Sequence, residues 1–71
     1  MTLTDRHRVF LEIVLRLSKG RDGAPWPEVA AEFGDGASEI FRELLVAQYF
    51  VTGREQDLVR LSPKGEMAVR P

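Results

Sequence analysis

The chain of 71 residues is long enough for one small domain and too short for two. Apolar residues make up 44% of it and charged residues 30%, proportions that are typical of a globular protein and exclude a disordered one. The absence of cysteine excludes disulfides and thiolate metal sites, and no apolar run is long enough to span a membrane. The first residues also lack the apolar stretch of a secretory signal, so we expect a cytoplasmic protein.

The net charge of −1 hides an uneven distribution along the chain. Residues 1–21 carry five basic residues against two acidic ones, and residues 58–71 carry three against one. Between them, residues 22–57 carry only two basic residues against eight acidic ones. Such asymmetry constrains the choice of partner more than it constrains the fold.

The pattern of residues 4–18 predicts a first helix. Thr4 is suited to the N-cap position, and Gly20 follows where a glycine often ends a helix. Apolar residues recur at helical spacing and predict one buried face, made of Val9, Phe10, Ile13, Val14 and Leu17.

Leu11 and Leu15 fall beside this face and widen it beyond the stripe of an ordinary surface helix. One interpretation is a homodimer in which the two copies pair through these leucines. The alternative is that the hairpin or the last helix of the same chain covers them. In so small a chain we expect the homodimer.

Two further helices are predicted after a loop over residues 20–25. Trp26 precedes a proline and should be extended, and Pro27 suits the first position of a second helix over residues 27–33. A glycine-rich turn over residues 34–36 separates it from a third helix over residues 37–48. The inner face of this third helix is predicted to be Ala37, Ile40, Phe41, Leu44, Leu45 and Ala47.

The last third of the chain changes to a strand pattern. Residues 49–52 and 58–61 are rich in aromatic and β-branched residues and flank a polar turn, which predicts a hairpin over residues 49–61. Ser62 and Pro63 are suited to begin a short final helix, which Met67 and Val69 could anchor. The predicted fold is mainly α with a small β-hairpin.

This order of elements resembles the winged helix-turn-helix family over residues 26–69. Residues 45–51 (LVAQYFV) are similar to the passage from the third helix into the first wing strand, although the family usually has glycine where this chain has Tyr49. Residues 59–65 (VRLSPKG) resemble the second wing strand and the entry to the last helix, as in bacterial regulators of the multiple-antibiotic-resistance and phenolic-acid-decarboxylase types. The resemblance implies a third helix that reads DNA and a hairpin that touches the DNA backbone.

The predicted outer face of the third helix gives a divided answer about DNA. Ser38 and Arg42 could contact base edges and phosphates, but Glu39 and Glu43 flank Arg42 and oppose the approach of phosphate. Val46 is apolar and should also face outward. The alternative to DNA contact is an ordinary solvated face with helical ion pairs.

The hairpin offers better candidates for phosphate contact. Arg54 should sit at its tip, Arg60 on its returning strand and Lys64 at the start of the last helix. Arg6 and Arg8 could add to the same basic surface. The alternative is scattered surface charge, which the acidic residues of the same turn favour.

No residues in the chain suggest catalysis, a bound metal or a cofactor. His7 is the only histidine, the serines lie where they would cap helices, and no glycine-rich loop joins a strand to a helix as a phosphate site requires. We therefore expect a non-enzymatic binding protein, in the first place a small DNA-binding transcriptional regulator or accessory factor. The alternative is a protein-interaction domain that does not bind DNA and uses the acidic face of the third helix or its first helix. One continuous basic face would favour DNA, and basic residues scattered around an acidic centre would favour a protein partner.

Overall fold

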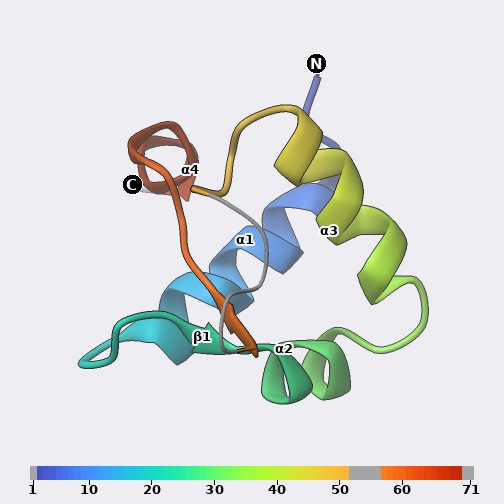
Figure 1. The fold of residues 1–71 in the computed structure, drawn as a ribbon. Coiled ribbons are helices and arrows are strands. Elements are labelled where there is room, and N and C mark those ends of the chain that lie inside the picture. The colour runs from blue at the N-terminus through green and yellow to red at the C-terminus, as the bar shows by residue number, and fades with distance from the viewer. Residues whose placement is uncertain (1, 52–56, 70–71) are drawn as a thin grey trace.

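The computed structural model describes residues 2–51 and 57–69, and within these ranges the chain forms four helices and a two-stranded antiparallel sheet. In chain order the elements are α1 (Asp5–Ser18), β1 (Ala24–Pro25), α2 (Trp26–Phe33), α3 (Ala37–Val46), β2 (Leu58–Val59) and α4 (Pro63–Val69). The other three helices are arranged around α1, which crosses the middle of the molecule in Figure 1. The predicted class, mainly α with a small β component, is confirmed. In the described part of the chain, no helix combines the length and apolarity needed to cross a membrane.

The start of α1 is fixed by a reciprocal cap between Thr4 and His7. The Thr4 side chain accepts a hydrogen bond from the His7 backbone amide at 3.3 Å, and the His7 ring accepts one from the Thr4 amide at 2.9 Å. These bonds satisfy two of the amides that a helix N-terminus leaves unpaired. The predicted N-cap is confirmed, and Gly20 follows the helix with a left-handed φ of 73°.

The buried face of α1 differs from the predicted one at two positions. Val9 was expected inside but is 48% exposed, whereas Leu11 is fully buried. Leu15, which was paired with Leu11 in the prediction, is only partly buried. Because α4 packs against α1, the single chain covers more of the helix circumference than one stripe. The buried residues of α1 are His7, Phe10, Leu11, Ile13 and Val14.

A cluster of aromatic rings joins the three longest helices to the segment after α3. The Phe10 ring of α1 lies 5.2 Å from Phe33 and 6.4 Å from Trp26 of α2, and 6.0 Å from Phe50. Phe41 of α3 stacks on Phe50 at 5.1 Å. Tilted and edge-to-face pairs at these distances add a favourable electrostatic contribution to the burial of the rings.

The loop predicted over residues 20–25 is corrected at its end, because Ala24 and Pro25 form β1 and pair with Val59 and Leu58 of β2. Trp26 was expected to be extended, but it opens α2. The predicted hairpin is confirmed only in part. Over the residues that are described, its two arms meet at a bridge between Phe50 and Leu61, supported by a 3.0 Å bond from the Val51 amide to the Arg60 carbonyl.

The third helix ends at Val46, two residues before the predicted end. Gln48 takes a left-handed φ of 70°, and its amide donates to the Leu45 carbonyl at 3.0 Å. The next amide, that of Tyr49, donates to the Leu44 carbonyl at 2.9 Å. This pair of bonds is the Schellman arrangement, which satisfies helix carbonyls that would otherwise be unpaired. A glutamine occupies the position that usually belongs to glycine, so this ending could not be predicted from the residue types.

The different burial of Leu11 and Leu15 leads to a test of how α1 packs in the core. We expect Leu11→Ala to lower the free energy of unfolding by about 2–5 kcal/mol, because it leaves a cavity in the core. Leu15→Ala should cost much less, since Leu15 is only partly buried. Urea denaturation of both variants measures the difference, and equal losses would contradict the packing of α1 described above.

The first turn of α4 lies directly against the chain that leaves α3. A Cβ added at Gly65 would collide with the Tyr49 carbonyl oxygen and would lie 3.1 Å from Leu61 Cδ2. We therefore expect Gly65→Ala to lower the melting temperature, although alanine is the better helix former by about 1 kcal/mol. A thermal melt followed by circular dichroism checks this, and an unchanged or higher melting temperature would show that α4 packs less closely.

Candidate functional site: the groove between α3 and α4

The outward face of α3 is the most exposed part of the site. Its exposed residues were all predicted from the helical period, and Val46 is 78% exposed, unusually so for an apolar side chain. Opposite them, the inner residues of α3 are buried or pack against the core as predicted. The exposed residues are Ser38, Glu39, Arg42, Glu43 and Val46.

Ser38 and Arg42 lie one turn apart on α3 and share a shallow depression. Its volume is about 220 Å³, and Phe41 and Leu45 complete its lining. Arg42 has no ion-pair partner within the described residues. These two predicted DNA contacts are thus brought together on an open surface.

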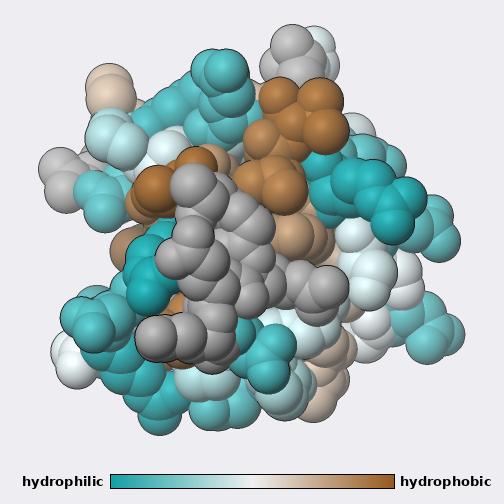
Figure 2. Space-filling view, viewed as in Figure 1, coloured by the Kyte–Doolittle hydropathy of each residue, from teal (hydrophilic) through white to brown (hydrophobic). Residues whose placement is uncertain are grey.

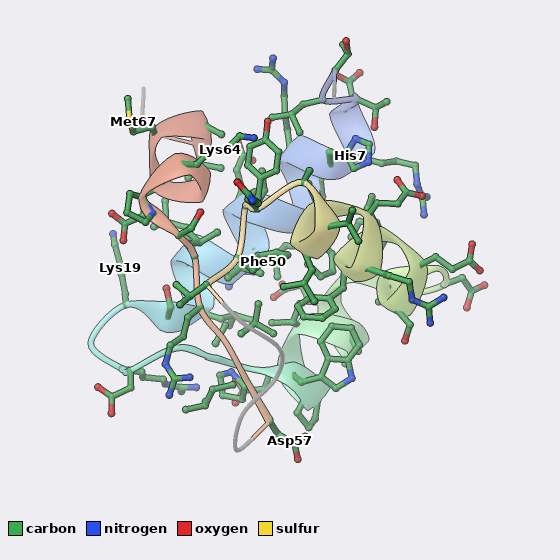
Figure 3. All side chains as sticks on the ribbon, turned by 45° about the horizontal axis from the view of Figure 1, so that its top comes forward. His7, Lys19, Phe50, Asp57, Lys64 and Met67 are labelled. Atoms are coloured by element: carbon green, nitrogen blue, oxygen red, sulfur yellow. The ribbon has the colours of Figure 1, made fainter. Side chains whose placement is uncertain are left out.

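Glu43 is held from α1 by His7, a contact that the sequence analysis missed (Figure 3). His7 is buried between the two helices, and its Nε2 lies 2.8 Å from Glu43 Oε1. Because the Thr4 amide donates to His7 Nδ1, the ring proton belongs on Nε2 and is donated to the carboxylate. The sequence shows a histidine three residues after a capping threonine, which is compatible with a capping bond. It does not predict the contact with Glu43, which is 36 residues away in the chain.

Lys64 reaches from α4 to the end of α3 (Figure 3). Its Nζ donates to the Ala47 carbonyl at 2.9 Å and lies 4.6 Å from the centre of the Tyr49 ring. Ser62 adds two bonds, from its hydroxyl to the Gln48 carbonyl at 2.7 Å and from its amide to the Tyr49 carbonyl at 3.0 Å. We call these contacts the α3–α4 corner. Here a cation stabilises the C-terminal end of a helix, where the helix dipole is negative.

A groove of about 620 Å³ lies beside this corner, and we refer to it as the α3–α4 groove. It is lined by Arg42, Glu43, Val46, Ala47 and Lys64. Figure 2 shows apolar surface gathered over the C-terminal end of α3. Met67, one turn from Lys64 on α4, is 75% exposed and points away from the core in Figure 3. The groove itself thus combines the exposed Val46 with one cation from each helix and with the carboxylate of Glu43, while Met67 lies outside its lining.

Among the described residues, Arg60 and Arg6 do not join this surface. The Arg60 Nε donates to the Asp22 carbonyl at 2.9 Å, and its side chain lines a separate depression that includes Leu15. Arg54 lies outside the described residues. Arg6 is at the opposite end of α3, where it donates to the Asp35 carbonyl at 3.4 Å and covers the Phe33 ring. The structure therefore separates cations that the sequence analysis grouped.

Two ion pairs involve charged residues of α1, α2 and the loop between them, outside the α3–α4 groove. Arg16 of α1 pairs with Glu32 of α2, and Arg21 pairs with Glu28 at 3.2 Å. Within the described residues, no three histidine or acidic side chains come close enough to hold a metal ion.

The proposed dimer residues are placed differently from the expectation. Leu11 is fully buried within one chain and offers no surface to a second copy, which corrects its assignment to a dimer interface. Packing within the monomer covers it, as the alternative interpretation had it. Leu15 keeps part of its surface at the edge of the depression that Arg60 lines.

Comparison with known proteins identifies no relative. No protein-family model matches the chain, and no curated protein and no solved structure matches it either.

Lys64 is bonded to a backbone carbonyl, whereas Arg42 has no ion-pair partner among the described residues, and this difference should appear in the stability of the protein. We expect Lys64→Ala to lower the free energy of unfolding by about 1 kcal/mol, since it removes a charged hydrogen bond to a helix carbonyl at an exposed position. Arg42→Ala should change it by less than about 0.5 kcal/mol. Urea denaturation of both variants is the measurement. A larger loss for Arg42→Ala would mean that Arg42 has a structural partner.

Proposed function

We propose that this chain is a winged-helix domain that binds another protein through the α3–α4 groove and has no catalytic role. The observation that carries the proposal is the groove itself, in which the 78% exposed Val46 lies between Arg42 and Lys64. Apolar surface gathered in a groove and rimmed by charged side chains supports a protein-interaction site, and Figure 2 shows such surface at the end of α3.

The order of elements supports the winged-helix part of the proposal. Three helices are followed by two chain segments that meet at the Phe50–Leu61 bridge. The short strand β1, which lies between α1 and α2 in the chain, pairs with β2 after α3. In a winged helix the third helix is the usual recognition element. Its exposed face in this chain is therefore the first surface to consider for a partner.

The distribution of charge favours a protein over DNA as that partner. Glu39 and Glu43 lie on the exposed face of α3, where they repel phosphate. Lys64 and Arg60 are already bonded to backbone carbonyls, and Arg6 is at the other end of α3. Phosphate binding gains from several cations on one continuous face, and the described cations are dispersed.

DNA binding is a second candidate because of one specific observation. Ser38 and Arg42 share an open depression on α3, and Arg42 has no ion-pair partner within the described residues. A serine and an arginine one turn apart on a recognition helix are suited to contact phosphate and a base edge. The transcriptional regulator predicted from the sequence would use these two residues.

Fluorescence anisotropy with labelled mixed-sequence duplex DNA at low salt distinguishes the two functions. We expect no binding by the unmodified chain, and weak binding by Glu39→Gln, because the substitution removes one phosphate-repelling charge from α3. Ser38→Gln serves as a control for adding a glutamine to the same face without changing the charge. Tight binding by the unmodified chain that is lost in Arg42→Ala would instead establish the regulator.

A further inference from the structure

We infer that the α3–α4 groove accepts an amphipathic helix of a partner protein that carries an apolar side chain flanked by carboxylates. This inference rests on the proposed protein-interaction function and adds the chemistry of the partner. The charged side chains on the two walls of the groove, together with the exposed Val46, point to such a helix.

The two walls of the groove contribute different side chains. On α3, Arg42 and Val46 are four residues apart and thus lie on the same side of the helix. On α4, Lys64 lines the groove, whereas the exposed Met67 lies outside the lining. Because Val46 is 78% exposed, the α3 wall offers an apolar contact and a positive charge, and the α4 wall offers a second positive charge.

The one carboxylate in the lining, Glu43, offsets only one of the two cations. Glu43 Oε1 accepts a hydrogen bond from the buried His7 ring at 2.8 Å, which turns part of its hydrogen-bonding capacity away from a ligand. Arg42 has no ion-pair partner within the described residues. The Lys64 ammonium uses one N–H for the Ala47 carbonyl, and an ammonium has three to donate. Charge complementarity therefore favours carboxylates on the partner.

The fixed position of Lys64 also favours binding. Its contacts with the Ala47 carbonyl and the Tyr49 ring already restrict the side chain. A partner carboxylate then meets a cation that has lost much of its rotamer freedom during folding, so less entropy is lost on binding. The volume of the groove, about 620 Å³, is in the range of ligand-binding clefts and exceeds that of one side chain, so it has room for an apolar anchor of a bound helix and for the side chains beside it.

The test uses two fluorescein-labelled helical peptides of the same length and anisotropy as the readout. The acidic probe has leucine anchors with glutamates three and four residues away, and the basic probe has lysines in place of those glutamates. We expect the acidic probe to bind more tightly than the basic probe. Arg42→Glu should raise its Kd about fivefold and reverse the preference toward the basic probe. Val46→Lys should raise the Kd for the acidic probe about tenfold, since a buried valine contact is lost.

Val9→Lys is the matched control, because Val9 is also exposed and apolar but lies on α1, outside the groove. It should leave both Kd values unchanged. If the unmodified chain instead binds the basic probe more tightly, and Val46→Lys weakens that binding, the acidic partner is overturned. The proposed protein-interaction function would still hold. Binding of duplex DNA with no binding of either probe would overturn both. Equal weakening by Val9→Lys and Val46→Lys would also overturn the inference, because the groove would not be the binding site.

Discussion

The packing of aromatic rings around Phe10 is the constraint on which the rest of this small structure depends. The chain has four phenylalanines and one tryptophan, and all five belong to this cluster. A domain of this size has few other ways to bury enough apolar surface, so the rings that join α1, α2, α3 and the segment after α3 also fix their relative positions. With the large aromatic rings used inside, the exposed apolar side chains available to a partner on α3 and α4 are smaller ones, Val46 and Met67.

The hydrogen bonds of the α3–α4 corner connect the packed core to the surface that carries the groove. Ser62, which precedes α4, and Lys64 of α4 donate hydrogen bonds to carbonyls of the turn that ends α3. These bonds satisfy groups that would otherwise depend on water, and they bring α4 so close that only a glycine fits at position 65. The two walls of the groove are consequently parts of one hydrogen-bonded unit, so a ligand meets a preformed surface.

The sequence predicted those features that depend on local pattern. Helical periodicity placed Arg42 and Val46 outside and Phe41 inside, and the threonine at the start of α1 predicted its cap. It could not predict β1, because a strand of two residues has no alternation to detect. Nor could it predict the environments of Leu11 and Lys64, whose partners are brought close only by tertiary packing. The same cause explains why Arg60 and Lys64, four residues apart in the chain, serve different surfaces.

The contrast between Arg42 and Lys64 explains how one groove could combine affinity with selectivity. Lys64 is held by a helix carbonyl and an aromatic ring, so its charge has a defined position. Arg42 is exposed without an ion pair in the described part of the chain, so its planar fork can adapt to the carboxylate it meets. A fixed cation selects the register of a ligand, and an adaptable one adds attraction without demanding a single geometry. Phosphate on a DNA duplex repeats its charge along the whole backbone and would meet Glu39 as well. A peptide can place a small number of carboxylates beside Arg42 and Lys64 and avoid Glu39, and this difference supports the proposed protein partner over DNA.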